Sequence, residues 1–152
     1  MNHAHLRQLV LTVLFSLVAK VSMAQQTPSY IPTEENLKAR QEFADSKLGI
    51  FIHWGIYSMF AQGEWYMTNA NIDNKEYAKA AFYPVNFDAK AWVSAIKAAG
   101  AKYICFTSRH HDGFSMWNTA QSDYNIVDAT PFGRDVIKEL ADECHRQGIK
   151  LH

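Results

Sequence analysis

Cysteine is scarce in this sequence of 152 residues, which contains only two. Two cysteines cannot form the crosslinked framework of a small disulfide-rich scaffold, so that class of protein is excluded. Cys105 lies within an apolar run and Cys144 within a helical pattern. Buried thiols at both positions are the favoured interpretation. A bridge between them stays open, because a sequence does not give the distance that a disulfide needs.

The sequence also lacks an excess of positive charge. Fifteen Lys and Arg residues balance fifteen Asp and Glu residues, and the basic residues are scattered without a cluster. Proteins that bind nucleic acid attract its phosphates with a basic surface. We therefore expect no nucleic-acid partner. Aromatic residues, in contrast, make up 13% of the chain, enough to supply both a core and an aromatic-lined cleft.

A third absence is an apolar run long enough to cross a bilayer. The apolar stretch from Leu9 to Ala19 has 11 residues, whereas a spanning helix needs about 20. It follows Arg7 and precedes Ser22-Met23-Ala24, a pattern typical of a signal peptide over residues 1–24. No cysteine follows the expected cleavage before Gln25, so a lipid has no attachment site there. We expect an exported protein, periplasmic or secreted, that is not bound to a membrane after cleavage.

The domain proper is predicted over residues 33–152, after a polar leader segment of residues 25–32. It alternates helical patterns with short apolar runs, and this order predicts a parallel sheet with helices packed outside it. The first helix is expected over 33–47, and the first strand over 48–52. A second helix, capped by Asp88 and ended by Gly100, leads to a second strand over 102–108. A third helix, with Asp135 in its first turn and ended by Gly148, leads to a third strand from Ile149.

The apolar spacing also predicts which side of each helix faces the sheet. The first helix would turn Leu37, Gln41 and Ala44 inward, the second Trp92, Ala95, Ile96 and Ala99, and the third Val136, Ile137, Leu140, Ala141 and Cys144. The first two strands are apolar without alternation, which is typical of parallel strands covered on both faces.

Connection lengths orient the sheet. The helix-to-strand connections are short, whereas the strand-to-helix connections span residues 54–87 and 109–134. Long loops thus gather at the carboxyl ends of the strands, which is the active-site face of a (β/α)8 barrel. The candidates on this face are His53, Glu64, His110, His111 and Trp117.

Only two and a half β/α units are present, and a complete barrel takes about 250 residues, so we expect a truncated, amino-terminal part of a TIM-like barrel. A doubly wound open sheet is the alternative. Neither of the first two strands is followed by the glycine-rich phosphate turn that a nucleotide-binding sheet of that kind would carry.

Two segments carry the chemistry of the chain. The first is Gly49-Ile50-Phe51-Ile52-His53-Trp54-Gly55 with Gly63-Glu64-Trp65-Tyr66 beyond it, and the second is Arg109-His110-His111-Asp112-Gly113-Phe114. Both resemble segments of family 29 alpha-L-fucosidases. The likeness continues through Phe87-Asp88-Ala89-Lys90-Ala91-Trp92, Met116-Trp117, Phe132-Gly133-Arg134-Asp135 and Gly148-Ile149-Lys150-Leu151. It therefore covers residues 30–152, and the ordered set of motifs is specific where any one alone would be weak.

The resemblance implies a (β/α)8 barrel that hydrolyses alpha-linked L-fucose with retention, through a covalent fucosyl-enzyme intermediate. It implies a fucosylated glycan as substrate and no cofactor or metal. The nucleophile of the family is an aspartate on a later strand, beyond His152. Glu64 matches a residue that binds the sugar, and in some members the matching glutamate is the acid/base. Nothing in the sequence indicates an oligomeric state.

By motif position, the resemblance implies that five residues bind the fucose ring: His53, Glu64, Trp65, His110 and His111. These residue types suit a sugar. Imidazole and carboxylate groups donate to or accept from hydroxyls at fixed angles, and an indole can pack on the sugar's C–H groups. Weaker candidates for substrate contact are Trp54, Tyr66 and Trp117. Asp112 is interpreted as a structural turn residue or an ion-pair partner of Arg109.

Two other functions compete with this one. The first is a metal-dependent barrel hydrolase, with His53, His110, His111 and Asp112 as ligands. Their spacing contains no His-x-His or His-x-x-x-His pair to support it. The second is a non-catalytic fucose-binding homologue that keeps the pocket without the catalytic carboxylates.

Overall fold

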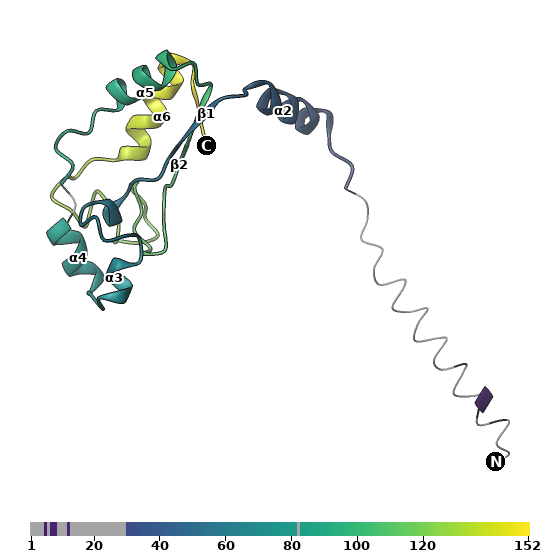
Figure 1. The fold of residues 1–152 in the computed structure, drawn as a ribbon, viewed down its shortest axis with the longest axis horizontal. Coiled ribbons are helices and arrows are strands. Elements are labelled where there is room, and N and C mark those ends of the chain that lie inside the picture. The colour runs from purple at the N-terminus through teal and green to yellow at the C-terminus, as the bar shows by residue number, and fades with distance from the viewer. Residues whose placement is uncertain (1–4, 6, 9–11, 13–29, 82) are drawn as a thin grey trace. The chain divides into compact units, whose positions relative to one another are not determined.

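The computed structural model describes residues 5, 7, 8, 12, 30–81 and 83–152 (Figure 1). The chain divides into two compact units, residues 1–40 and 41–152. Most of the predicted signal peptide, and its cleavage point, lie outside the described residues. Within the part that is described, no helix has the length and apolar character needed to cross a membrane.

Helix α2 (Glu34–Asp45) begins where the sequence predicts. The Thr33 hydroxyl caps it by accepting a hydrogen bond from the Asn36 backbone N–H at 3.2 Å. The predicted inward face is wrong, because α2 has no buried residue. Leu37 is 51% exposed, and Gln41 bonds along the surface of the helix to the Asp45 carboxylate at 3.1 Å. Its twelve residues are mostly polar, which leaves too few apolar side chains for a core-facing stripe.

The second unit contains a three-stranded parallel sheet in the order β1-β2-β3. Figure 1 labels the two longer strands, β1 and β2, which run side by side. The strands are β1 (Gly49–Ile52), β2 (Tyr103–Phe106) and β3 (Lys150–Leu151). The remaining elements are η1 (Ile56–Ser58), α3 (Tyr66–Asn69) and α4 (Asn74–Ala81) in the first long connection, α5 (Ala89–Ala98) between β1 and β2, and α6 (Val136–Gln147) between β2 and β3. The predicted parallel sheet and its alternation with helices are confirmed.

Side chains in the sequence fix the ends of the two long helices beside the sheet. Asp88 caps α5 by accepting from the Ala91 N–H at 2.9 Å, and Asp135 caps α6 by accepting from the Lys138 N–H at 2.8 Å. Asp135 is therefore the capping residue and not part of the first turn. Gly148 ends α6 in the left-handed conformation, with φ of 73°.

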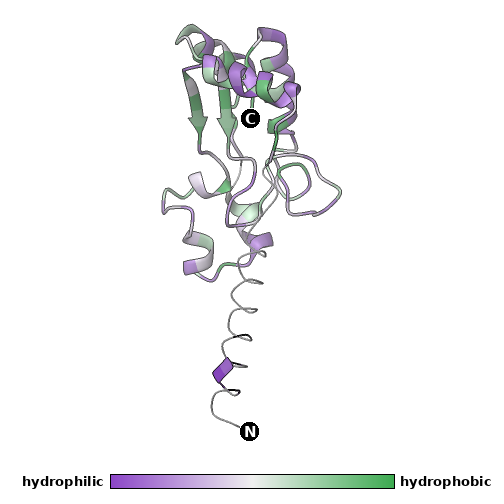
Figure 2. Cartoon of the chain, turned by 90° about the vertical axis from the view of Figure 1, so that its right-hand side faces the viewer, coloured by the Kyte–Doolittle hydropathy of each residue, from purple (hydrophilic) through white to green (hydrophobic). Residues whose placement is uncertain are grey.

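One face of the sheet packs against α5 and α6 and forms the core. Ile104 of β2, Val93 of α5 and Leu140 of α6 are all completely buried. In Figure 2 the two longer strands have the green of hydrophobic residues, whereas the helices beside them mix green with purple. The inward face of α5 is centred on Val93, so the predicted inward positions Ala95 and Ala99 are exposed. Val136, Leu140 and Cys144 of α6 are buried as predicted, whereas Ala141 is exposed because it lies to the side of this buried row.

The opposite face of the sheet is not fully covered by the described residues, so the predicted cover on both faces is present here on one face only. Phe51 of β1 is 66% exposed, and Tyr103 and Cys105 of β2 are half-buried. Burial therefore alternates along β2, although its sequence is apolar throughout. Both cysteines are free thiols; Cys144 is buried as predicted, whereas Cys105 is partly exposed on this face.

Candidate functional site

The site starts where β1 and β2 end side by side. Their register pairs Phe51 with Cys105 and Ile52 with Phe106, so the next position brings His53 beside Thr107. The Thr107 N–H continues the ladder by donating to the Ile52 carbonyl at 3.1 Å. The side chains follow this register, because His53 Nδ1 lies 3.0 Å from Thr107 Oγ1. His53 therefore stands at the carboxyl edge of the sheet, as predicted.

A tight turn presents the two adjacent histidines. The Gly113 N–H donates to the His110 carbonyl at 3.0 Å, and the Asp112 carboxylate accepts from the Phe114 N–H at 2.9 Å. Gly113 has φ of 75°, a left-handed conformation that glycine adopts without strain. Since β2 has already ended at Phe106, the alternation of a strand no longer sends the two rings to opposite sides. Their centroids lie 4.4 Å apart, nearly perpendicular at 85°.

Five rings form a continuous cluster at this edge. The centroids of His53 and His110 lie 4.7 Å apart, and Tyr57 lies 4.9 Å from each of them. His111 continues the cluster from His110 and stacks on Trp65 at 4.1 Å, with 19° between the planes. Four of the five predicted binding residues are thus brought together by direct ring contact.

Glu64, the fifth predicted residue, precedes Trp65 in the loop between η1 and α3 and is half-buried. Its negative charge helps to raise the pKa of Tyr57. The same charge also acts to raise the pKa of His110, but burial and the neighbouring imidazoles have larger effects and lower that pKa overall. It therefore lies within electrostatic range of both rings. Trp65 stands at the start of α3 and is 46% exposed, so the indole keeps open surface beyond its stack on His111.

Burial controls the charges in the cluster. It raises the pKa of the Tyr57 hydroxyl to about 12, with a further contribution from the Asp112 carboxylate. It lowers the pKa of His110, and the neighbouring His111 and His53 lower it further. It raises the pKa of Asp112, which is 8% exposed, against the opposing hydrogen bond from Phe114. The neutral forms of Tyr57 and His110 are therefore favoured.

Asp112 is a turn residue, as the sequence predicts. Its Oδ1 closes the turn by accepting from the Phe114 N–H, while its Oδ2 is buried and has no hydrogen-bond partner among the described residues. Among the described residues no ion pair joins Asp112 to Arg109, the alternative role considered for it. The backbone of Arg109 instead pairs with Ser115 in an isolated antiparallel bridge, which closes the base of the turn.

The three weaker candidates lie apart from the ring cluster. Trp54 stacks on Phe87 at 5.7 Å and meets Trp92 edge-on at 5.2 Å, so it packs against the core. Tyr66 packs 5.6 Å from Phe60. Trp117 is half-buried, and no ring contact joins it to the histidines within the described part of the chain.

Sequence reasoning missed Tyr57 and Thr107. Tyr57 is 7% exposed and lies between His53 and His110, and Thr107 contacts His53 directly. The signal for Thr107 was its place in the pattern, since it follows the apolar run of β2 as His53 follows that of β1. Tyr57 carried no such signal, because it reaches the cluster through the short helix η1.

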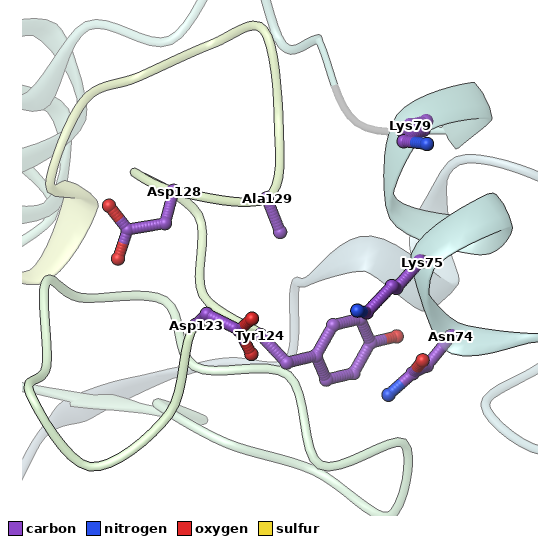
Figure 3. Close-up of a pocket in the computed structure, with 7 residues that line it drawn as sticks. All are labelled: Asn74, Lys75, Lys79, Asp123, Tyr124, Asp128 and Ala129. Atoms are coloured by element: carbon purple, nitrogen blue, oxygen red, sulfur yellow. The ribbon is translucent and has the colours of Figure 1, made fainter.

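A separate pocket of about 220 Å³ opens between α4 and the loop of residues 123–129 (Figure 3). Two lysines line its α4 side and two aspartates its loop side, and none of the predicted site residues lines it. The lining residues are Asn74, Lys75, Lys79, Asp123, Tyr124, Asp128 and Ala129. Tyr124 connects this pocket to helix α3, because its hydroxyl donates to Met67 Sδ at 3.4 Å.

The residues of the rival metal site are not arranged as a set of ligands. Among the described residues, His, Cys, Asp and Glu side chains form no group of three that could hold an ion. His53 Nδ1 is already in contact with two hydroxyls, those of Thr107 and Tyr57.

Comparison with known proteins identifies the family. The family model described as alpha-L-fucosidase matches residues 17–152. The chain belongs to the alpha-L-fucosidase family. The plasma alpha-L-fucosidase of Rattus norvegicus is 36% identical over 82% of this chain and 31% of its own length. The alpha-L-fucosidase of Dictyostelium discoideum is 33% identical over 95% of this chain and 36% of its own. The chain thus spans about a third of the length of these relatives.

Solved structures of alpha-L-fucosidases share the fold of this chain. A bacterial fucosidase with an iminocyclitol inhibitor has a TM-score of 0.71 and 30% identity, over 83% of this chain and 31% of its own. The alpha-L-fucosidase of Lactobacillus casei in complex with its alpha-L-fucose product has a TM-score of 0.66 and 42% identity, over 73% of this chain and 38% of its own. At these identities the likeness extends beyond the fold to the family that the sequence motifs indicated.

Proposed function

We propose that this chain forms the amino-terminal part of the (β/α)8 catalytic barrel of an alpha-L-fucosidase. The three parallel strands with α5 and α6 packed on one face have the order of barrel units. The chain spans 31% and 36% of the length of two relatives. The open face of Phe51 and Cys105 would then be the interior of the barrel, which further strands would cover.

Five residues in this proposal bind the fucose ring: His53, Glu64, Trp65, His110 and His111. The observation that carries it is the ring cluster at the carboxyl edge of the sheet, where barrel enzymes have their active sites. The polar groups of the cluster lie beside aromatic surface. This combination suits a sugar with hydroxyls on one side and a methyl group on another.

Contacts inside the cluster hold these groups before any sugar binds. Trp65 is stacked on His111, and His110 meets both His111 and His53. Neutral imidazoles can donate through one nitrogen and accept through the other. They thus match the mixed donor and acceptor character of sugar hydroxyls, and their fixed angles favour one epimer over another.

The reaction we propose is hydrolysis of a terminal alpha-L-fucose from a glycoconjugate or oligosaccharide, with retention. It needs two carboxyl groups, a nucleophile and a proton donor, about 5 Å apart. Glu64 is first a sugar-binding residue and second a candidate for the acid/base. The nucleophile, by the family pattern, is an aspartate outside this chain, so residues 25–152 alone are expected to be inactive.

Export is a separate part of the proposal. The pattern of Arg7, the apolar stretch from Leu9 to Ala19 and the small residues Ser22 and Ala24 supports a signal peptide over residues 1–24. Cleavage would deliver the enzyme to the periplasm or the medium. The amino-terminal sequence of the mature protein tests this, with Gln25 as the expected first residue.

Hydrolysis of an aryl alpha-L-fucoside by the complete enzyme tests the activity. We expect release of the aryl group, with the alpha anomer of fucose as the first product in a proton NMR time course. Fucose binding without hydrolysis would instead indicate the non-catalytic homologue. Activity that a chelator abolishes and a divalent metal restores would indicate the metal-dependent hydrolase. The beta anomer as first product would overturn the retaining mechanism.

A further inference from the structure

His53 is held at one ring nitrogen by two hydroxyl groups. Its Nδ1 lies 3.0 Å from Thr107 Oγ1 and 3.3 Å from the Tyr57 hydroxyl oxygen. Both distances are within hydrogen-bond range, and the two hydroxyls come from different elements, the end of β2 and the helix η1. The other ring nitrogen, Nε2, has no hydrogen-bond partner among the described residues, and the His53 side chain is exposed.

The backbone fixes both hydroxyls. Thr107 is tied to β1 by its N–H bond to the Ile52 carbonyl at 3.1 Å. Tyr57 is 7% exposed and lies in η1, where the Gly55 N–H donates to Ser58 Oγ at 3.3 Å. The Tyr57 ring packs directly over Gly55, because a Cβ there would come within 2.7 Å of the ring. The ring is therefore held in place by packing as well as by its hydroxyl.

The protons of these hydroxyls need an acceptor. Burial raises the pKa of Tyr57 to about 12, so its hydroxyl stays protonated, and a buried donor without an acceptor is costly. An imidazole nitrogen that carries a lone pair can accept from either hydroxyl. A protonated Nδ1 would instead donate to a hydroxyl oxygen, and the buried Tyr57 proton would lose the ring nitrogen as its acceptor. The arrangement therefore favours a neutral ring with the lone pair on Nδ1 and the proton on Nε2.

We propose that Thr107 and Tyr57 are positioning residues that hold His53 as the Nε2–H tautomer, so that His53 presents an N–H donor to the sugar. This proposal rests on the proposed function for the identity of the ligand. The group that pairs with an N–H is an oxygen lone pair, so His53 would recognise a hydroxyl oxygen of the fucose ring. A deoxy sugar without that hydroxyl would leave the N–H unpaired and would be rejected.

Nitrogen NMR of the complete enzyme, labelled at its histidine rings and measured without substrate, tests the tautomer directly. We expect Nε2 of His53 to carry the proton and Nδ1 to have the shift of an unprotonated nitrogen. Replacing both hydroxyls, in the double variant Tyr57→Phe and Thr107→Val, should produce a mixture of tautomers. A protonated Nδ1 in the wild-type enzyme would overturn the proposal, and this measurement does not require any variant to fold.

Kinetics with a matched pair of variants separates the hydroxyl from the shape of the side chain. Thr107→Val keeps the branched shape without the hydroxyl and should lower kcat/KM by about 3- to 10-fold, the effect of one hydrogen bond. Thr107→Ser keeps the hydroxyl and should retain most of the activity. Equal activity of the two variants would contradict the proposal.

The outcomes distinguish this proposal from the proposed function. If the enzyme hydrolyses fucosides while His53 is protonated at Nδ1, only the positioning proposal is contradicted. An enzyme that shows the Nε2–H tautomer but neither binds nor hydrolyses fucosides would sink the proposed function, and with it the recognition of a sugar hydroxyl. The tautomer would then have to serve another ligand.

Discussion

The two faces of the sheet differ although the same strands form both. On one face Ile104 and Phe106 are buried against α5 and α6. On the other face Phe51 is exposed and Cys105 is half-buried, and the same rows continue past the strand ends to His53 and Thr107. Alternate residues of one strand therefore belong either to the core or to the row that leads into the site.

Residues that stabilise the fold and residues of the candidate site therefore lie close together in the sequence but on different faces of the sheet. The covered face is held together by apolar packing, and the residues of its core cluster all lie within residues 41–152. The open row ends in polar groups that keep unused hydrogen-bonding capacity, as with Nε2 of His53. Substitutions on the covered face should therefore reduce stability, whereas those in the site should reduce activity.

The largest expected effect is on the covered face. Ile104 is completely buried, and Ile104→Ala should lower the free energy of unfolding by about 2–5 kcal/mol through lost burial and the cavity left behind. Urea unfolding of the complete enzyme measures this. Ile137→Ala, at a half-buried position of α6, is the control and should cost less. If Ile104→Ala instead reduced kcat/KM at unchanged stability, the assignment of the covered face to stability would be wrong.

A site substitution should show the opposite behaviour. Glu64→Gln removes the charge of a half-buried carboxylate that has no hydrogen bond to another described side chain, so the unfolding free energy should change little. Loss of charged hydrogen bonds to a sugar should lower kcat/KM by about 10- to 100-fold. Fucosides with poor leaving groups are the critical substrates. Wild-type activity on them would mean that Glu64 neither binds the sugar nor acts as acid/base.

The turn that carries His110 and His111 allows a finer comparison with a second glycine turn outside the site. Gly113 has φ of 75° and Gly133 has φ of 61°, so alanine at either position should cost about 1 kcal/mol of stability. Neither site would clash, since the nearest atom to a Cβ at Gly113 is an Arg109 nitrogen at 3.7 Å. Only Gly113→Ala should also weaken fucose binding, because its turn presents the two histidines. Equal binding by both variants would show that the turn does not position them.

The sequence predicted the parts of the fold that depend on local rules. The cap at Asp88, the end of α6 at Gly148 and the parallel order all follow from residue type and spacing, whereas Asp135 caps α6 just before the first turn in which it was predicted. The open face was not predictable, because an apolar run does not reveal whether anything covers it. Leu37 shows the same limit, since one apolar residue on a polar helix does not define a buried face.

The site was predictable where residues follow a strand or belong to a known motif. His53 and the histidine pair met both conditions, and the ring contacts bring them together. Tyr57 met neither, because its approach to His53 depends on a single turn of 3-10 helix. Trp54, in contrast, belongs to the motif but does not join the site. It directly follows His53 in the motif, yet successive residues point to opposite sides, and it packs into the core with Phe87.

The smallest expected effect is on pH dependence, and it has a definite sign. Burial and the neighbouring imidazoles lower the pKa of His110 below its ordinary value of 6.5. The unfolded chain therefore binds a proton at this residue before the folded chain does. The contribution of His110 to stability is complete above pH 6.5 and declines as the pH falls toward its folded pKa.

His110→Asn removes this titration, so the acid side of its stability curve should decline less steeply than that of the wild type. His145→Asn, at an exposed position of α6, is the matched control for replacing a histidine outside the ring cluster. A steeper decline in the His110 variant would mean that the protonated form is favoured in the folded enzyme, contrary to the neutral ring inferred for the site.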